Sequence, residues 1–263
     1  MQKEKSKTEI RHEKIRGMLI ANDLVTVAEF CQALDCSEAT IRNDLRYLEE
    51  LGLLKRSFGG AVANGKTALY SNMNMRSVAY RKEKESIAAY IVKHILSSGQ
   101  TIILDSGSTA VEIAKKILES SLELTVLTNS FAAASLLTNS DKIKLYMASG
   151  CYDERSASFH DELSQALFET MRADICFLGV NGVSHEAGFT ISGHEEASIK
   201  QAMIRCSQKC IVPADTSKLG KIGLKIICSL TDVDTLICDT DNGDGELDLL
   251  KSAGLNVVFA DHG

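Results

Sequence analysis

The sequence has no run of about 18 or more uncharged apolar residues, which is the length that a transmembrane helix requires. Its first stretch, MQKEKSKTEIRHEKIR, is highly charged and lacks the apolar centre of a secretory signal peptide. Tryptophan is absent and proline occurs once, and neither deficit excludes a fold class. We therefore expect a cytoplasmic protein that has no membrane partner.

Metal-binding spacings are also missing. The eight cysteines include no C-x-x-C pair, because four residues separate Cys31 from Cys36 and three separate Cys206 from Cys210. The six histidines form no H-E-x-x-H motif. A thiol inside an apolar run packs as a small hydrophobe, which describes Cys176, Cys210, Cys228 and Cys238. We expect buried, reduced thiols, no metal site and no cofactor.

The net charge of −6 shows no basic excess, which at first argues against a nucleic-acid partner. The charge is unevenly distributed, however. Residues 1–66 contain 11 Lys and Arg against 10 Asp and Glu, giving +1, so the remaining 197 residues carry −7. An almost neutral head on an acidic body favours two domains, of which only the head meets DNA.

The head, residues 1–62, has the pattern of two short helices joined by a tight turn. Thr26 and Glu29 form a capping box, which predicts that a helix begins at Val27. Ser37 caps a second helix that runs to about Leu51. An earlier helix containing Ile15, Met18 and Leu19 would cover this pair.

The second helix separates its apolar and polar residues. Ile41, Leu45 and Leu48 share one face, and the opposite face carries Ala39, Arg42, Asn43 and Arg46. Arginine and asparagine can pair bidentately with guanine and adenine in the major groove. After Gly52, LLKRS, a Phe-Gly-Gly turn and AV predict a β-ribbon whose Lys55 and Arg56 could meet phosphates. The alternative is a helical hairpin with a solvated charged face.

The body, residues 76–263, follows a polar linker at 63–75. It begins with one long helix at 76–99, after which apolar runs alternate with helical patterns. The runs are TIILD, LTVLTNS, KIKLYMAS, ICFLGV, KCIVPAD, TLICD and NVVFAD. Strands that are apolar almost throughout and separated by helices predict a mostly parallel sheet covered on both faces. The fold class is therefore α/β.

Polar residues follow the carboxyl ends of these strands, where such sheets bind ligands. Gly107 precedes a helix whose free N–H groups favour a phosphate, and Lys218 supplies a cation. The expected site contains Asp105, Gly107, Ser108, Thr109, Thr128, Asn129, Ser130, Asn181, Gly182, Glu195 and Lys218. The hydroxyls and amides among them suit a polyol phosphate. Turn and capping chemistry is the alternative explanation of each motif taken alone.

The chain resembles DeoR-type bacterial transcriptional regulators over nearly its whole length. VTVAEFCQALDCSEATIRNDLRYLEELGLLKRSFGGAV resembles their DNA-binding head, and ILDSGST, LTNS, FLGVNGV, GHEEASIKQAMI and ADTSKLG resemble their sensor domain. The resemblance implies a winged helix-turn-helix domain followed by a Rossmann-like domain related to ribose-5-phosphate isomerase and glucosamine-6-phosphate deaminase. It also implies repression controlled by a phosphorylated sugar or related metabolite.

The resemblance implies that the head contacts DNA and that the body binds the effector. The expected DNA-binding residues are Ser37, Thr40, Arg42, Asn43, Arg46, Lys55 and Arg56. The partners are double-stranded DNA, a phosphorylated sugar and further copies of the chain. Three departures from the family pattern stand out, namely Arg42-Asn43-Asp44 in place of two arginines and aspartate, Ser149-Gly150 in place of Gly-Gly, and Phe159-His160-Asp161 in place of a small Val-Gly step.

A sugar-phosphate isomerase or deaminase with an accessory DNA-binding head is the competing hypothesis. Such enzymes need a base beside the substrate carbonyl, usually a carboxylate. The related isomerases have an acidic Asp-Gly-x-Asp-Glu segment where this chain has Leu178-Gly-Val-Asn-Gly-Val183. Asp105, Asp215, Glu195 and Asp239 remain as candidate bases. We predict binding without turnover, hence no catalytic residues and no enzyme.

Overall fold

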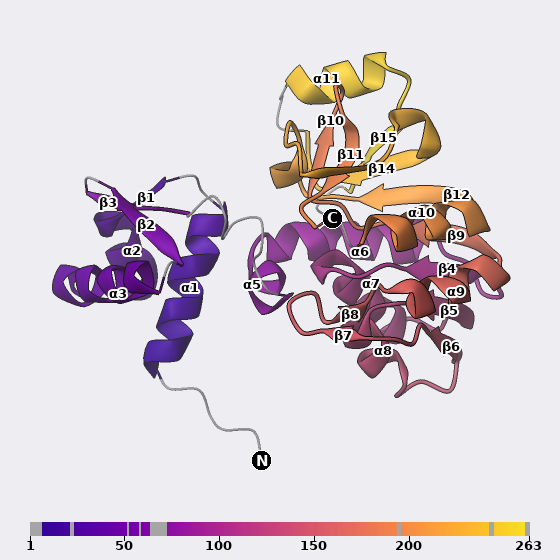
Figure 1. The fold of residues 1–263 in the computed structure, drawn as a ribbon, viewed down its shortest axis with the longest axis horizontal. Coiled ribbons are helices and arrows are strands. Elements are labelled where there is room, and N and C mark those ends of the chain that lie inside the picture. Colours follow the sequence, from indigo (N-terminus) through magenta and orange to yellow (C-terminus); the bar gives the residue numbers. More distant parts are fainter. Residues whose placement is uncertain are drawn as a thin grey trace. The chain divides into compact units, whose positions relative to one another are not determined.

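The structure is a computed structural model that describes residues 7–21, 24–51, 53–57, 59–63, 73–193, 196–241 and 245–260. The chain divides into two compact units, Met1–Tyr80 and Arg81–Gly263 (Figure 1). Of the linker expected at 63–75, residues 64–72 lie outside the described residues. No helix in the described ranges has both the length and the apolar character needed to cross a bilayer.

The first unit combines helices with a small antiparallel sheet. Its elements are α1 (Lys7–Ala21), β1 (Leu24–Thr26), α2 (Val27–Leu34), α3 (Glu38–Glu50), β2 (Leu54–Ser57), β3 (Gly60–Ala63) and α5 (Met73–Val78). The sheet order is β1-β3-β2, so β2 and β3 form the predicted ribbon and β1 is an addition. The Thr26–Glu29 capping box and the Ser37 cap are confirmed.

The apolar faces of α1, α2 and α3 pack together to form the core of this unit. Ile15 and Leu19 of α1 pack with Phe30 of α2 and with Ile41 and Leu45 of α3. These residues are at most 3% exposed. The 3.6-residue period therefore predicted correctly which side of each helix is buried.

The single helix predicted at 76–99 is wrong. The structure has α5, which ends at Val78, and a separate α6 (Arg81–His94). Tyr80 between them has a φ of 52°, in the left-handed region that a continuing right-handed helix does not use. No apolar residue occurs from Arg81 to Ser86, so the apolar period that begins at Ile87 did not extend to the region of the break.

The second unit is built on a seven-stranded parallel sheet. Its strands are β4 (Thr101–Leu104), β5 (Leu124–Thr128), β6 (Ile143–Met147), β9 (Ala173–Phe177), β12 (Ser207–Pro213), β14 (Thr235–Cys238) and β15 (Val257–Phe259). Their order is β15-β14-β12-β9-β4-β5-β6, and all neighbours are parallel. All seven apolar runs predicted as strands are confirmed.

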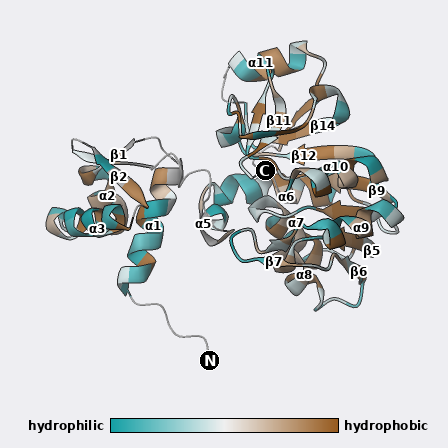
Figure 2. Ribbon diagram, viewed as in Figure 1, coloured by the Kyte–Doolittle hydropathy of each residue, from teal (hydrophilic) through white to brown (hydrophobic). Residues whose placement is uncertain are grey.

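Helices cover both faces of this sheet. Alternate residues of β4 point to opposite sides, with Ile102 and Leu104 in one core and Ile103 in the other. The first core includes α6, α7 (Ser108–Leu118) and α8 (Phe131–Leu137), and the second includes α9 (Glu162–Thr170), α10 (Ala197–Cys206) and α11 (Gly245–Ser252). Figure 2 shows the hydrophobic colour on the strands, whereas the helices carry mixed colours. The predicted α/β class is confirmed.

Several short elements were not predicted. They are the hairpin β7 (Tyr152–Asp153) and β8 (Ser158–Phe159), the antiparallel sheet of β10 (Gly182–Ser184), β11 (Gly188–Ile191) and β13 (Lys225–Cys228), and the 3-10 turns η1 (Thr216–Lys218) and η2 (Leu230–Asp232). All are four residues or shorter, too short for a periodic signal. The cysteines in apolar runs are buried as expected, whereas Cys31 and Cys36 are half-buried and Cys151 is exposed.

The chain order of the parallel strands fixes where a ligand can enter. From β4 the chain moves outward to β5 and β6, then returns to β9 on the other side of β4. Two successive crossovers thus diverge between β4 and β9. In doubly wound sheets this topological switch point opens a crevice beyond the carboxyl ends of the strands.

Candidate functional site

The exposed face of α3 carries the expected polar residues. Arg42, Asn43 and Arg46 are exposed, whereas Ile41 and Leu45 of the same helix are buried. Arg42 and Arg46 of α3 and Arg56 of β2 line one hollow of about 320 Å³ together with Val27, Leu45 and Gly60. A cationic hollow between α3 and the β-ribbon suits a polyanion.

Acidic residues of α3 hold two of these arginines in place. Arg42 Nη2 lies 3.2 Å from Glu38 Oε2, and Arg56 Nε lies 2.6 Å from Glu49 Oε2. Glu49 also accepts the backbone N–H of Arg56 at 2.7 Å, which fixes β2 to the end of α3.

Two of the other expected DNA-binding residues lie at the start of α3. Ser37 and Thr40 hydrogen-bond to each other at the start of α3, with 2.9 Å between their hydroxyls. Lys55 lies on β2 in register with Val62, but its side chain is outside the described residues.

Asp44 has a role that the sequence pattern did not reveal. It is 6% exposed, because its spacing of three residues from Ile41 and four from Leu48 places it on the buried side of α3. Arg11 donates to both of its oxygens, at 2.5 and 3.1 Å, and His12 Nε2 lies 2.9 Å from Oδ1. Burial raises the pKa of Asp44, but the hydrogen bonds from Arg11 and His12 outweigh burial and bring it below its ordinary value. The carboxylate thus joins α3 to α1.

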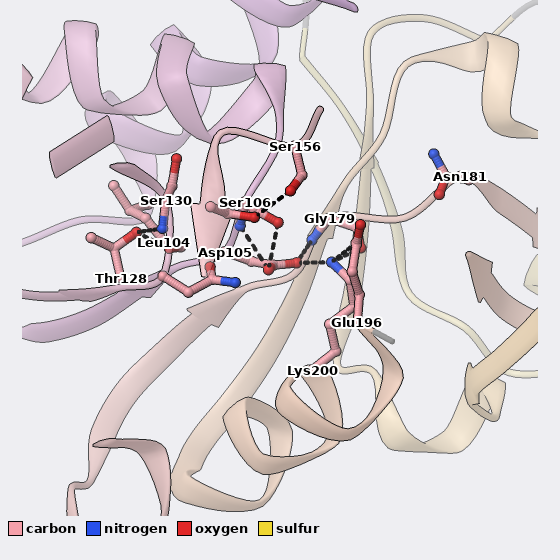
Figure 3. A network of polar contacts seen from close by, with 12 residues as sticks. Leu104, Asp105, Ser106, Thr128, Ser130, Ser156, Gly179, Asn181, Glu196 and Lys200 are labelled. Atoms are coloured by element: carbon pink, nitrogen blue, oxygen red, sulfur yellow. Dashed lines mark hydrogen bonds and ion pairs between the residues drawn. The ribbon is translucent and has the colours of Figure 1, made fainter. Parts of the chain in front are cut away.

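In the second unit, Asp105 ends β4 at the switch point and is fully buried. Its Oδ1 accepts the Ser106 N–H at 2.7 Å, and its Oδ2 accepts the Gly179 N–H at 2.8 Å (Figure 3). Lys200 of α10 donates to the same Oδ2. Asp105 therefore joins the loop after β4 to the loop after β9, which is a positioning role within the expected site.

Lys200 was missed as a site residue. It is 2% exposed, and its Nζ also donates to the Gly179 carbonyl at 3.1 Å and lies 3.7 Å from Glu196 Oε2. The available signal was a lysine on the apolar face of a helix, next to Ile199 and Met203. A buried ammonium requires partners of opposite charge, which predicts a carboxylate beneath it.

Gly107 shapes the start of α7. Its φ of 135° and ψ of 165° lie in a region that glycine almost alone adopts. An added Cβ would meet nothing within 4 Å, so backbone conformation, and not crowding within the protein, requires glycine here. As N-cap it offers no side chain to the first N–H groups of α7, and Ser108 and Thr109 follow at once. Uncapped helix N-termini attract anions.

The loop after β5 is buried beside this helix start. Thr128 donates to the Leu104 carbonyl at 2.6 Å and accepts the Ser130 N–H at 3.0 Å. Asn129 is 1% exposed and donates to the Phe159 carbonyl at 3.0 Å. Within the described residues, its Oδ1 is buried without a hydrogen-bond partner. The side-chain oxygen of Asn129 is therefore available to accept a hydrogen bond.

Lys218 lies in η1, immediately after β12, where Asp215 and Asp239 are both buried. Asp239 accepts the Thr216 N–H at 2.7 Å, and burial raises its pKa. Burial also raises the pKa of Asp215, but the charges of Lys218 and Lys84 outweigh this effect and place it below its ordinary value.

The remaining expected residues are distributed differently. Asn181 lies apart from the Asp105 cluster, and its Oδ1 accepts the Ser192 N–H at 3.0 Å (Figure 3). At Gly182 a Cβ would collide with the Lys221 carbonyl, so this glycine permits close backbone packing. Glu195 lies outside the described residues.

Two of the departures from the family pattern, at Ser149-Gly150 and at His160-Asp161, lie close together in the structure. Asp161 accepts the Cys151 N–H at 2.7 Å and caps α9 through Ser164. The Cys151 N–H and the Ser164 groups lower the pKa of Asp161. A Cβ at Gly150 would collide with this carboxylate. The acidic residue is therefore engaged by its own loop.

These features define a class of protein: a helix-turn-helix DNA-binding unit joined to an α/β unit that has a potential anion site at its switch point. The chain matches the DeoR-like helix-turn-helix domain over residues 11–67 and the DeoR C terminal sensor domain over residues 80–240. It belongs to the DeoR family of transcriptional regulators. Within the described residues, no group of three His, Cys, Asp or Glu could hold a metal ion.

Individual relatives match most of the chain. The chain is 33% identical over 251 residues to the HTH-type transcriptional regulator GolR of Listeria innocua, covering 95% of this chain and 98% of that protein. It is 28% identical over 253 residues to the glycerol-3-phosphate regulon repressor of Haemophilus influenzae, covering 96% and 97%. The structure of ribose 5-phosphate isomerase A from Methanocaldococcus jannaschii aligns with a TM-score of 0.39 and 22% identity, covering 53% and 55% of the two chains.

Proposed function

We propose that the protein represses a carbohydrate-metabolism operon and that a phosphorylated sugar controls its binding to operator DNA. The observation that carries the proposal is the uncapped start of α7 at the switch point, in a chain that also has a helix-turn-helix unit. We place this activity in the cytoplasm.

On the first unit, we infer that α3 enters the major groove. Arg42, Asn43 and Arg46 would then face base edges, since they form its exposed side. Arg56 lies on the neighbouring strand, and we assign it to a backbone phosphate.

On the second unit, we assign the phosphate to the N–H groups of Ser108 and Thr109 and to the ammonium of Lys218. The buried Oδ1 of Asn129 requires a donor, which a sugar hydroxyl would supply. A phosphate beside a polyol chain satisfies both requirements.

We further propose that this site binds without turnover. A general base must reach a proton of the substrate. Asp105 is enclosed by Lys200 and Gly179, and Asp215 is paired with Lys84 at 3.2 Å. Asp239 is 4% exposed and holds the Thr216 N–H. These engaged carboxylates favour a sensor over the isomerase alternative.

A thermal-shift screen of triose, pentose and hexose phosphates tests the assignment. A ligand at one hundred times its dissociation constant should stabilise the wild-type protein by about 2.7 kcal/mol. Lys218→Ala should lose most of this shift, because it removes a charge-assisted hydrogen bond to the anion. The exposed Lys221→Ala is the matched control and should retain it. Equal stabilisation of wild type and Lys218→Ala would place the anion elsewhere.

A further inference from the structure

The first helix of the second unit contains a buried charge that its role in covering the sheet does not explain. On α6, Lys84 shares the spacing of Ile87, Ala88 and Ile91, the residues that this helix buries. Lys84 itself is 3% exposed. Burying an ammonium is costly unless it is paired, so an apolar residue would serve better if packing were its only role.

The partner of Lys84 is a residue at the candidate effector site. Lys84 Nζ lies 3.2 Å from Asp215 Oδ2, and Asp215 is 1% exposed. Asp215 is the N-cap residue of η1, the short turn that contains Lys218. Ser217 donates to the second carboxylate oxygen. The carboxylate is therefore held from α6 on one side and from the η1 turn on the other.

Two cations act on this one carboxylate. The charges of Lys218 and Lys84 both favour its ionised form against the effect of burial. An anion that binds Lys218 would partly neutralise it and so weaken its attraction for Asp215. Lys84 would then become the main counterion of Asp215. Ligand binding thus changes the forces on α6 although Lys84 does not touch the ligand.

Helix α6 also adjoins the other part of the proposed anion site. Its Ile87 and Ile91 belong to one apolar cluster with Ile113 and Ala114 of α7, the helix whose first N–H groups would bind the phosphate. Near its start, Ser86 donates to the Ala260 carbonyl at 3.1 Å. Both sides of the phosphate site are therefore in contact with α6.

The position of α6 in the chain places the Lys84–Asp215 contact close in sequence to the first unit. Arg81 is the first residue of both α6 and the second unit. Only Ala79 and Tyr80 connect it to α5, which belongs to the first unit. Lys84 lies in the first turn of α6, so a change at Lys84 acts four residues from the covalent junction with the DNA-binding unit.

We propose that the Lys84–Asp215 ion pair couples effector binding at the Lys218 turn to the DNA-binding unit through α6. Lys84 is a positioning residue in this scheme and makes no contact with the effector. The inference rests on the proposed phosphate site. It adds the route by which the site influences DNA binding, since coupling requires an element whose interactions differ between the bound and unbound states.

Hydrogen exchange in the full chain, with inorganic phosphate as the probe and sodium chloride at matched ionic strength as the reference, tests the coupling. In the wild-type protein, phosphate should slow exchange at residues 106–110, at 216–220 and in the segment 79–86. In Lys84→Met, phosphate should still slow exchange at the first two segments but no longer at 79–86. Lys93→Met, on the exposed side of the same helix, is the control and should behave as the wild type.

Operator affinity supplies the functional readout. Phosphate should change the affinity of the wild-type protein for the DNA upstream of its own operon by about fivefold or more, the lower limit of typical allosteric coupling. In Lys84→Met the change should fall below about twofold, while affinity without phosphate stays the same. Lys84→Arg, which keeps the charge, should restore part of the response.

The outcomes separate the two proposals. If Lys84→Met keeps the phosphate response at both 79–86 and the operator, the coupling role is overturned while the phosphate site stands. If the wild-type protein shows no protection at 106–110 or 216–220, the phosphate site and the coupling fail together. Should Lys84→Met not fold, the double variant Lys84→Met with Asp215→Asn removes both buried charges and should show the same loss of coupling.

Discussion

Among individual residues, three pairs of opposite charge that contain a buried member are the most informative. Lys200 pairs with Asp105, Lys84 with Asp215, and Arg11 with Asp44. Leaving one member of such a pair alone in the interior costs several kcal/mol, about 3–5 by typical measurements. These pairs therefore hold the elements of both proposed binding sites in position.

The arginines around the hollow of the first unit should have distinct effects on DNA binding. Arg42→Ala and Arg46→Ala should each weaken operator binding by about 1–3 kcal/mol and relax specificity, because they lose base contacts. Arg56→Ala should weaken binding to all sequences alike and reduce the salt slope by about one, because it loses a phosphate contact.

Fluorescence anisotropy with an operator duplex and a scrambled duplex, over a range of salt concentrations, distinguishes these effects. Arg205→Ala, an exposed change on α10, is the control and should leave both affinities unaltered. An unchanged operator affinity in Arg42→Ala and Arg46→Ala would show that α3 is not the recognition helix.

Gly107→Ala tests the start of α7 at a single residue. A side chain at a φ of 135° is strained, so the protein should lose about 1–3 kcal/mol of stability. The backbone relaxation should also redirect the N–H groups of Ser108 and Thr109, which would lower phosphate affinity. Gly193→Ala is the matched control, since Gly193 has ordinary φ and open space around its Cα. Equal melting temperatures and equal phosphate affinities in the two variants would contradict this role.

At the scale of elements, the position of α3 depends on its connections to α1 and β2. Glu49 ties α3 to β2, and Asp44 ties α3 to α1. Both acids lie on α3, so the helix that we propose presents arginines to DNA also carries the residues that fix its position. An amphipathic pattern shows which face of a helix is polar but not which polar residue will be an anchor.

The anchor at Asp44 should make the stability of the first unit depend on pH. Its pKa is lower in the folded protein than in the unfolded chain, where aspartate titrates near 3.9. Its contribution is therefore complete above about pH 5 and is lost as the pH falls through the folded value. At pH 7, Asp44→Asn should destabilise α1 and α3 by about 1–3 kcal/mol, and this difference should shrink below about pH 4.

Hydrogen exchange of α1 and α3 amides in the full chain, measured between pH 7 and pH 3, checks this prediction. Asp35→Asn is a suitable control, because Asp35 is exposed and asparagine tolerates its positive φ. A constant difference between wild type and Asp44→Asn across this range would show that the carboxylate charge does not contribute.

At the scale of the whole molecule, we expect DNA recognition to use more than one copy of the chain. A single recognition helix reads only a few base pairs, and paired helices read two half-sites related by symmetry. We predict that the protein is a homo-oligomer through its second unit. In sedimentation at micromolar concentration, residues 76–263 alone should self-associate as the full chain does. A monomeric second unit would contradict this prediction.

The sequence by itself determined the fold class and most of the main elements. Cap residues and the 3.6-residue period predicted α2 and α3, and seven uniformly apolar runs predicted the seven strands of the parallel sheet. These signals are local, because each depends on residues within one element. The strand-end motifs were predictable for the same reason: parallel strands bring all their carboxyl ends to one edge.

Only the tertiary structure decided which residues meet. Asp105 and Lys200 are 95 residues apart in the chain, and Lys84 and Asp215 are further apart still. The sequence analysis assigned Asp105 to ligand binding, but its burial and its hydrogen bonds to three residues favour a positioning role. The same analysis grouped Asn181 with Asp105, whereas the structure places Asn181 apart from the Asp105 cluster. Such pairings follow from strand order, which apolar runs do not encode because any order of seven buried strands satisfies the same pattern.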